Sequence, residues 1–410
     1  MRHVIIGNGV AGVTAAQAIR AADDSAEIHI LSAEPYLYYY RPRLWELISG
    51  KSEEEAIYFR PESFYQEKRI QVHLGVAAAA LDPKAHTIRL PDGERMTYDR
   101  ALLAMGGHSF VPPVEGADQK GVFTLRTLED ARALMDYADQ VDSAAIIGGG
   151  LLGLETAHSL KTRGLKKVTV IEFMPHLLPR QLDPPGAAVL QALLEEMGLA
   201  FITDGATQVI RQENGSLACN LKDGRAVRGG LVLFSTGIRS NVALAKEAGI
   251  EVDRSVVIDD FLRASAEDVF AAGDVAQYQG VTYGIIPAAT EQGKAAGANM
   301  VDEKSTPYNG TIPNNRLKVV GINLVSIGEA TAEEEDGVSI LRRQDDSGGQ
   351  YQRVTLRDGK VTGAILIGST ENFLPLKRLI DSGQDVSAYQ ERLLDESFDL
   401  KALSQGKPVE

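Results

Sequence analysis

The sequence predicts an α/β fold in which one strand–turn–helix plan occurs twice and a smaller α+β domain follows. Two observations carry this prediction: the glycine turn at residues 7–12 recurs at 148–153, and both turns are followed by matching segments in the same order. A third observation is a change of pattern near residue 306, where short alternating strands replace the repeated plan. The strand-and-helix alternation is typical of parallel sheets covered by helices.

Composition narrows the class of protein before any motif is considered. The 410 residues are enough for two or three domains, and 44% hydrophobic with 24% charged residues is typical of a globular protein. The net charge of −14 argues against binding to nucleic acid or to an anionic membrane, because both would be repelled. No apolar run approaches the roughly 20 residues of a membrane span.

The N-terminus has a basic start and an apolar middle, as a short signal peptide does. Its removal would destroy the first glycine turn, however, and the matching elements of that turn recur downstream. We therefore expect a cytoplasmic protein in which this segment forms the first strand and helix.

Each copy of the plan begins with a strand, HVII at 3–6 or AAII at 144–147, that runs into a GxGxxG turn. The first glycine permits a tight turn, the second lets the backbone approach a pyrophosphate, and the third lets the following helix pack closely. A lone GxGxxG is a weak signal, but its repetition in matching surroundings predicts two dinucleotide sites. The turn residues expected to bind are Gly7, Gly9, Val10, Ala11 and Gly12, and then Gly148, Gly150, Leu151, Leu152 and Gly153.

A helix rich in small residues follows each turn, at 13–22 and at 154–163, and Gly164 stands where a helix C-cap prefers glycine. A hairpin with an Asp-Gly turn, at 92–93 or 223–224, comes later in each copy. It precedes a strand that ends in glycine, at 101–107 or at 231–237.

The second strand of each copy, 27–34 or 166–172, ends in an acid. Glu34 lies 34 − 12 = 22 residues after the last glycine of its turn, and Glu172 lies 172 − 153 = 19 residues after the last glycine of its own. Both match the spacing of about 20 that is expected of a ribose-binding acid. Because a carboxylate repels a 2′-phosphate, Glu172 favours NADH over NADPH.

After the second copy, the segment VFAAGD at 269–274 reads as a strand that ends in Gly273 and Asp274. A ligand could approach the glycine and hydrogen-bond to the aspartate there, although a simple turn explains the pair equally well. A small-residue helix at 287–300 suits packing against a planar ligand or against a sheet. Beyond residue 306 we expect strands with an Asp-Gly hairpin, followed by helices at 371–385 and 386–396.

The two turns, the single AAGD strand, and the segments EPYLYYYRPRL at 34–44 and TLRTLEDA at 124–131 carry a family resemblance. The chain resembles the FAD-dependent pyridine nucleotide-disulfide oxidoreductases over essentially its whole length. It is most similar to their NADH:rubredoxin and ferredoxin reductase branch, and also to the N-terminal part of nitrite reductase large subunits.

The resemblance implies two Rossmann-like domains, an FAD domain with an NAD(P)H domain inserted in it, and a small C-terminal α+β domain. The implied boundaries are 1–110 and 242–305 for FAD, 111–241 for NADH, and 306–410 for the C-terminal domain.

The resemblance also implies roles for individual residues. Arg41 and Pro42 would lie beside the flavin, and Glu155 would be an acid near flavin and nicotinamide, so Arg41 and Glu155 are the candidate catalytic residues. The alternative interpretation of Glu155 is an acidic residue that would be favoured in the first turn of any helix. The other implied cofactor-binding residues are Ala77, Ala104, Met105, Gly106, Arg126, Gly237, Gly273, Asp274 and Ile286, in addition to the two glycine turns, Glu34 and Glu172.

Two positions depart from the family pattern. Met105 stands where the pattern has threonine, so a side-chain hydrogen bond is lost. Glu46 stands where related ferredoxin reductases have a lysine that pairs with the acid corresponding to Glu155. We therefore expect Arg41 or Arg43 to supply the positive charge instead.

The cysteine content decides how electrons can leave the flavin. Cys219 is the only cysteine and lies far from the flavin segment, so neither a CxxxxC disulfide nor an active-site thiol is available. No metal site is expected either, because Glu155 and His158 form only one ExxH pair. The implied function is electron transfer from NADH through FAD directly to a small iron–sulfur carrier such as rubredoxin or ferredoxin.

Two alternatives remain open: a peroxide-forming NADH oxidase, and an NADH-responsive redox sensor or scaffold. Carriers of this type tend to be acidic, so docking would need a local basic patch, for which Arg41, Arg43 and Arg60 are candidates. A homodimer is possible.

Overall fold

The computed structural model describes residues 1–213, 215–319, 322–345, 348–407 and 409. The chain divides into two compact units. The first unit contains residues 1–44, 52–110 and 238–313, and the second contains 45–51, 111–237 and 314–410. The three-domain boundaries implied by the resemblance stay a prediction.

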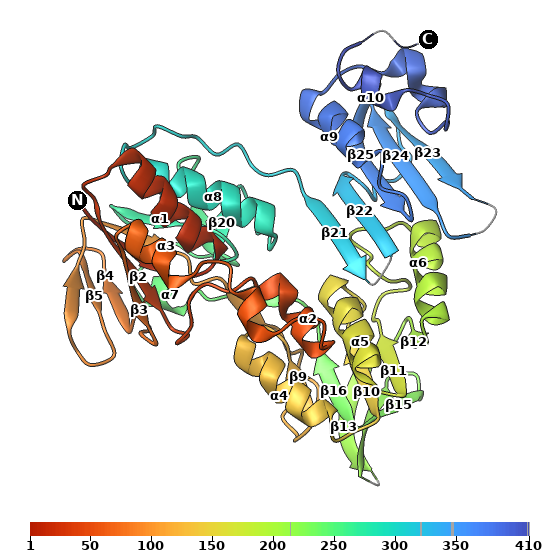
Figure 1. The fold of residues 1–410 in the computed structure, drawn as a ribbon, viewed down its shortest axis with the longest axis horizontal. Helices are drawn as coiled ribbons and strands as arrows, with labels where there is room; N and C mark the ends of the chain where they lie inside the picture. The colour runs from red at the N-terminus through yellow and green to blue at the C-terminus, as the bar shows by residue number, and fades with distance from the viewer. Residues whose placement is uncertain (214, 320–321, 346–347, 408, 410) are drawn as a thin grey trace. The chain divides into compact units, whose positions relative to one another are not determined.

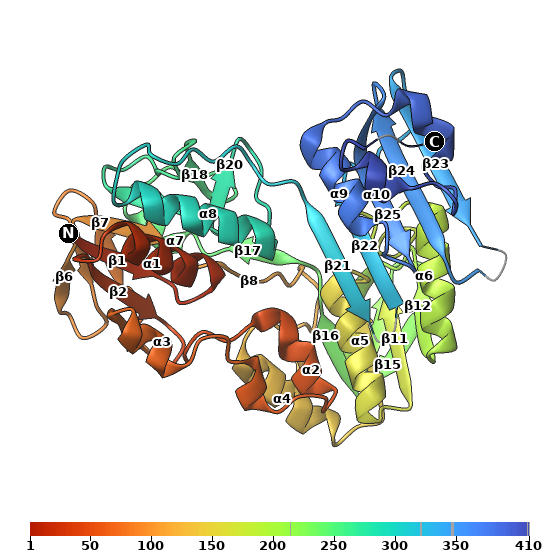
Figure 2. The same ribbon diagram turned by 45° about the horizontal axis from the view of Figure 1, so that its top comes forward.

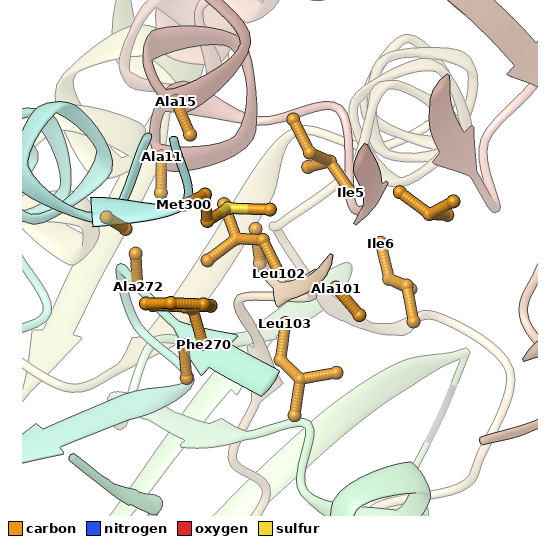
Figure 3. Close-up of a cluster of buried hydrophobic side chains, with 14 of the residues drawn as sticks. Ile5, Ile6, Ala11, Ala15, Ala101, Leu102, Leu103, Phe270, Ala272 and Met300 are labelled. Carbon is orange, nitrogen blue, oxygen red and sulfur yellow. The ribbon is translucent and has the colours of Figure 1, made fainter. Parts of the chain in front are cut away.

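The first unit is built on a five-stranded parallel sheet in the order β19-β7-β1-β2-β3. Figure 1 labels β2 and β3 of this sheet. The strands are β1 (Arg2–Ile6), β2 (Glu27–Ser32), β3 (Ile70–Leu74), β7 (Arg100–Leu103) and β19 (Val269–Ala271). The apolar runs of β1, β2, β7 and β19 are buried because helices cover parallel sheets, whereas the edge strand β3 is partly exposed. Figure 3 shows the resulting core, in which Ile5, Leu102 and Phe270 are at most 2% exposed.

Helices α1 (Val10–Ala22) and α8 (Ile286–Asn299) lie side by side in both ribbon views (Figures 1 and 2). A Cβ atom at Gly293 would stand 2.5 Å from the backbone oxygen of Ala11, and one at Gly297 would stand 2.4 Å from that of Ala15. The small residues of α8 therefore serve close packing on another helix. The sequence had suggested a sheet or a planar ligand as the packing partner.

The rest of the first unit consists of short elements. A three-stranded antiparallel sheet contains the predicted Asp-Gly hairpin at 92–93, and two further strand pairs are β8–β17 and β18–β20. The strands are β4 (Ala80–Asp82), β5 (Thr87–Arg89), β6 (Arg95–Thr97), β8 (Gly107–Ser109), β17 (Ile238–Ser240), β18 (Val256–Ile258) and β20 (Ala276–Tyr278). The helices are η1 (Arg41–Arg43), η2 (Glu54–Ile57), α3 (Glu62–Glu67) and α7 (Ala243–Glu247).

The second unit repeats the parallel sheet in the order β12-β11-β10-β16-β9. Its strands are β9 (Val122–Thr124), β10 (Ser143–Ile147), β11 (Lys167–Ile171), β12 (Leu199–Ile202) and β16 (Leu231–Phe234). Its helices are α4 (Leu128–Ala138), α5 (Leu151–Arg163) and α6 (Pro184–Glu196), together with most of α2 (Leu44–Ile48). A three-stranded antiparallel sheet of β13 (Thr207–Glu213), β14 (Ser216–Leu221) and β15 (Ala226–Gly229) contains the second Asp-Gly hairpin.

The C-terminal part of the second unit has a five-stranded antiparallel sheet in the order β21-β22-β25-β24-β23. The strands are β21 (Asn314–Val319), β22 (Ile322–Gly328), β23 (Val338–Gln344), β24 (Tyr351–Arg357) and β25 (Lys360–Ile367). The predicted strand stretch also included residues 320–321, which lie outside the described residues.

The first C-terminal helix appears as α9 (Phe373–Ser382). The helix predicted at 386–396 is instead the 3-10 turn η3 (Ser387–Arg392), followed by the short α10 (Leu400–Leu403).

The duplicated plan is present in both parallel sheets, with shifted boundaries. Helices α1 and α5 each begin three residues earlier than expected, at Val10 and Leu151, because the last part of each glycine turn is already helical. Gly164 ends α5 with φ 124°, as its C-cap position predicted. Among the described residues, no helix has the length and apolar character that crossing a membrane would need.

Candidate cofactor-binding sites

The two glycine turns are built alike. Gly7 has φ 120° and its N–H donates to the Leu31 backbone oxygen at 2.8 Å, while Gly148 has φ 116° and donates to the Ile171 oxygen at 2.8 Å. A Cβ atom would stand 2.2 Å from the Ala104 oxygen at Gly7, and 2.2 Å from the Ser235 oxygen at Gly148. The close approach of neighbouring backbone thus explains the first glycine of each turn.

Close backbone contacts also explain the third glycine of each turn. A Cβ atom would stand 2.0 Å from the Gly7 oxygen at Gly12, and 2.1 Å from the Gly148 oxygen at Gly153. Both contacts are far shorter than packing allows, so the helix can follow its strand so closely only if these positions carry no side chain.

Among the described residues, no close backbone contact explains why the second position of each turn is a glycine. Gly9 and Gly150 have ordinary extended backbone angles. A Cβ atom would meet only the Arg41 Nη1 atom, at 3.8 Å, at Gly9 and nothing within 4 Å at Gly150. The absent side chain leaves open space beside each turn, which is the space that a close-approaching pyrophosphate needs. The residues present therefore fit a dinucleotide in each unit.

The helix that follows each turn offers its N-terminus to a ligand. Neither α1 nor α5 has a side-chain cap, since a glycine occupies both N-cap positions. The first N–H groups of a helix lack intrahelical partners and carry partial positive charge, which attracts phosphate.

The two predicted ribose-binding acids have different partners. In the first unit, Glu34 accepts hydrogen bonds from the Tyr39 hydroxyl and from the Arg41 guanidinium, with which it forms an ion pair. The Arg41 guanidinium also lies over the Tyr39 ring, 5.1 Å from its centroid. The structure thus brings Arg41 to Glu34, and a role for Arg41 beside the flavin stays a prediction.

In the second unit, Glu172 is buried and bound to the backbone. Its Oε2 accepts the Gly149 N–H at 2.6 Å, and its Oε1 accepts the Met174 N–H at 2.8 Å. The carboxylate therefore lies directly at the glycine turn of its own unit. Phe173, the next residue, is 67% exposed.

The turn at 104–106 is held by a residue that the sequence did not single out. The Asn241 side chain donates to the Met105 backbone oxygen at 2.8 Å, and the Asn241 N–H donates to the Gly106 oxygen at 2.9 Å. The turn is thus secured through its backbone, so methionine can replace threonine without loss of this support.

Gly273 and Asp274 follow β19 and are fixed by two further hydrogen bonds. The Gly273 N–H donates to the Gln292 side-chain oxygen at 2.8 Å, and the Ser240 hydroxyl donates to the Asp274 backbone oxygen at 2.6 Å. Gly273 also has φ 83°, so the turn favours glycine for conformational reasons. Its Cβ position lies 3.0 Å from the Ala11 Cβ atom, which brings this turn next to the start of α1.

Glu155 lies on α5 two residues after the glycine turn and is largely shielded from solvent. Burial, and secondarily the nearby Glu46 carboxylate on α2, raise the pKa of Glu155 to about 8. The Arg163 guanidinium, also on α5, donates to the Ile48 backbone oxygen at 3.2 Å and so ties α2 to α5. The charged group near Glu155 from position 46 is thus a like charge, where the family pattern has a lysine.

Other predicted positions are scattered among the two units. Ala77 is exposed after β3, and Ile286 is the first residue of α8. Gly237 has φ 94° with open space at its Cβ position. The Arg126 N–H, just before α4, donates to the Asp130 carboxylate in the first turn of that helix at 2.8 Å. Pro42 lies in η1, next to Arg41. Their contacts with a cofactor stay predictions.

The sulfur and metal chemistry is limited. Cys219 is buried on β14, and burial raises the pKa of its thiol to about 12, so the thiol stays protonated. Within the described part of the chain, no group of three or more His, Cys, Asp or Glu side chains could hold a metal ion.

Sequence reasoning missed several residues near the first turn. Asn8 accepts a hydrogen bond from the Tyr65 hydroxyl at 3.0 Å, although the two are 57 residues apart. Asn8 could have been noticed inside GNG, but no local signal marks Tyr65, Asn241 or Gln292. Of the arginines expected in a docking patch, Arg43 donates to the Ala56 backbone oxygen.

Both parts of the chain match known protein families. A family model described as pyridine nucleotide-disulphide oxidoreductase matches residues 1–293, and one described as the rubredoxin NAD+ reductase C-terminal domain matches residues 313–384. The chain is 30% identical over 381 residues to the NADH-rubredoxin oxidoreductase of Clostridium acetobutylicum, with 93% of this chain and 94% of that protein covered.

It is also 33% identical over 387 residues to a nitrite reductase of Bacillus subtilis (strain 168), with 94% of this chain and 48% of that protein covered. The chain spans about half the length of several curated relatives that it matches. Among solved structures, the covalent putidaredoxin reductase–putidaredoxin complex matches with a TM-score of 0.88 and 25% identity, over 99% of this chain and 98% of that one.

Proposed function

The chain belongs to the pyridine nucleotide-disulphide oxidoreductase family, as the resemblance indicated, and we propose that it is an NADH-dependent FAD flavoprotein that reduces a small iron–sulfur protein. FAD would bind at the glycine turn of the first unit and NADH at that of the second. The curated relatives include an NADH-rubredoxin oxidoreductase and a ferredoxin–NAD(+) reductase component, which supports this acceptor class.

The observation that carries the proposal is the pair of open second glycines. Among the described residues, a Cβ atom would meet no atom closer than 3.8 Å at Gly9 and none within 4 Å at Gly150, and both glycines precede an uncapped helix N-terminus. An enzyme that binds only one dinucleotide would not need an open glycine turn in each of two units.

The residues of the chain provide binding and orientation. The N-termini of α1 and α5 would each hold a pyrophosphate, and Glu172 would accept hydrogen bonds from ribose hydroxyls while it repels a 2′-phosphate. When bound, FAD would supply the chemistry that links two-electron donation by NADH to one-electron acceptance by a carrier. Cys219 takes no part, because its buried thiol is not in the reactive thiolate form.

The test begins with the purified protein. We expect a bound flavin that is bleached by NADH without oxygen and is then reoxidised quickly by added rubredoxin or ferredoxin, but slowly by air. NADPH should bleach it less efficiently than NADH. Protein that carries no flavin and cannot be reconstituted with FAD would overturn the proposal.

The same experiment separates the alternatives. Fast aerobic turnover with release of peroxide would identify an NADH oxidase. Slow reduction that changes the oligomeric state, without electron delivery to either carrier, would identify a redox sensor. A homodimer and a cytoplasmic location remain predictions, and size-exclusion chromatography with light scattering measures the first.

A further inference from the structure

Three buried N–H donors around the first glycine turn have no hydrogen-bond acceptor among the described residues: Asn8 Nδ2, Arg41 Nε and Arg60 Nε. Asn8 is part of the turn, and Arg41 Nη1 lies 3.8 Å from the Cβ position of Gly9. Buried donors are normally paired, because an unpaired one costs about 1 to 3 kcal/mol. Since all three are donors, the missing partner is a group rich in acceptors.

Arg60 is connected to the turn through aromatic residues. Its guanidinium carbon lies 4.5 Å from the Phe59 ring centroid and 5.0 Å from that of Phe64. Phe64 in turn packs edge-on against Tyr65, with centroids 5.2 Å apart, and the Tyr65 hydroxyl donates to Asn8 Oδ1 at 3.0 Å. Arg60 also lowers the otherwise raised pKa of Tyr65, as a neighbouring positive charge does.

The two phenylalanine rings contact the face of the Arg60 guanidinium, and its Nε atom has no acceptor among the described residues. Stacking uses the planar face, whereas hydrogen bonds are donated in the plane. Within the described part of the chain, the Arg60 side chain donates one hydrogen bond, a long one of 3.4 Å to the Phe59 backbone oxygen. Within the described residues Arg60 forms no ion pair, in contrast to Arg41, which is paired with Glu34.

The charge balance points to an anion. Arg41 is paired with Glu34, whereas Arg60 is a cation that has no carboxylate partner among the described residues. A pyrophosphate offers both negative charge and several acceptor oxygens, and arginine binds phosphate through in-plane hydrogen bonds. We propose that Arg60 is a further ligand of the FAD pyrophosphate in the first unit, with Asn8 Nδ2 donating beside it. This proposal rests on the proposed function, which assigns FAD to that unit.

The test compares Arg60→Met, which keeps the length of the side chain and removes the charge, with Arg95→Met. Arg95 is an exposed arginine on β6 of the same unit and serves as the matched control. FAD is removed from each protein and titrated back while flavin fluorescence is recorded. We expect the FAD dissociation constant to rise at least tenfold in Arg60→Met and to stay within twofold in Arg95→Met.

A second measurement reads the phosphates directly. In ³¹P NMR spectra of the FAD-loaded proteins, Arg60→Met should shift a pyrophosphate signal, whereas Arg95→Met should leave both signals in place. Wild-type FAD affinity together with unshifted signals in Arg60→Met would overturn the proposal, and so would weakened affinity with unshifted signals.

The fold of each variant is followed by the melting temperature of the FAD-free protein. If Arg60→Met does not fold, Arg60→Gln replaces it and is judged by the same two measurements. A wild-type protein that binds no FAD would instead refute the proposed function, so the two failures are distinguishable.

Discussion

The Glu172 carboxylate accepts the Gly149 N–H at 2.6 Å, so the acid at the end of β11 and the glycine turn after β10 form one hydrogen-bonded unit. The two residues are 23 positions apart in the chain and follow neighbouring strands of the sheet. A change at residue 172 should therefore affect both nucleotide preference and the stability of the turn.

Replacing Glu172 by arginine should shift cofactor preference toward NADPH. The substitution removes the repulsion of a 2′-phosphate and adds a positive charge, so the NADPH/NADH ratio of kcat/KM should rise at least tenfold, or about 1.4 kcal/mol. The melting temperature should also fall, because the Gly149 and Met174 N–H groups lose their acceptor. Glu172→Gln, which retains one acceptor oxygen, is the control, and an unchanged ratio would mean that residue 172 does not contact the ribose.

Substitutions in the first glycine turn should separate folding from cofactor binding. Gly9→Ala meets open space, so the FAD-free protein should melt at the wild-type temperature while its FAD affinity falls at least tenfold. Gly7→Ala places a Cβ atom 2.2 Å from the Ala104 oxygen at a positive φ, and should cost about 3 kcal/mol of unfolding free energy. Thermal melts measure the stability of each variant, and FAD titrations measure its affinity. A Gly9→Ala protein with normal FAD affinity would contradict the prediction that this turn binds the FAD pyrophosphate.

Glu155 should make the protein less stable as the pH rises. Its folded-state pKa of about 8 lies above the ordinary value of 4.5, so the folded state holds a proton that the unfolded state has lost. The penalty is absent below about pH 4.5, grows between there and pH 8, and is complete above pH 8. Glu155→Gln removes it and should stabilise the protein by about 4 kcal/mol at pH 8 but not at pH 4.

Urea unfolding at several pH values measures this difference. Glu196→Gln, at an exposed position on α6, should show no such pH dependence. Glu46→Gln should act in the same direction as Glu155→Gln but more weakly, because burial is the larger cause of the shift. Equal effects of Glu155→Gln at pH 4 and pH 8 would refute the elevated pKa.

Cys219 should be dispensable for electron transfer. Its thiol is buried with a pKa of about 12, so iodoacetamide should not label the native protein, and Cys219→Ala should reduce the carrier at the wild-type rate. The substitution should cost about 1 kcal/mol of stability through lost packing. Loss of carrier reduction in a folded Cys219→Ala protein would reveal a thiol relay after all.

Asp183 should be important for the stability of the second unit. It caps α6 and accepts the Tyr351 hydroxyl at 2.6 Å, and it lies 3.5 Å from the guanidinium of Arg353, which is 1% exposed. Asp183→Asn leaves that buried charge without its carboxylate and should cost about 3 kcal/mol. Asp142→Asn removes an exposed pair with Lys166 and should change the unfolding free energy by less than about 1 kcal/mol in the same denaturation experiment.

Much of the fold could be predicted because its signals are local. Both GxGxxG turns, the strands before them and the Asp-Gly hairpins are where their spacing placed them. Helix boundaries were harder to predict. Helix α1 starts at Val10, and the helix expected at 386–396 is only a 3-10 turn. Neither of these segments has a side-chain N-cap that would have marked its start in the sequence. The cofactor contacts of the individual residues remain predictions.

The sequence by itself determined the repeated plan, the family and the absence of a second thiol, because these depend on residue identity and on short spacings. Only the tertiary structure decided which donors and acceptors meet: Arg41 with Glu34, Gly149 with Glu172, and Glu46 with Glu155. It likewise left the Arg60 Nε atom without an acceptor among the described residues. The physical reason is that periodicity specifies strands and helices locally, whereas a hydrogen bond or a shifted pKa depends on segments that only folding brings within a few ångströms.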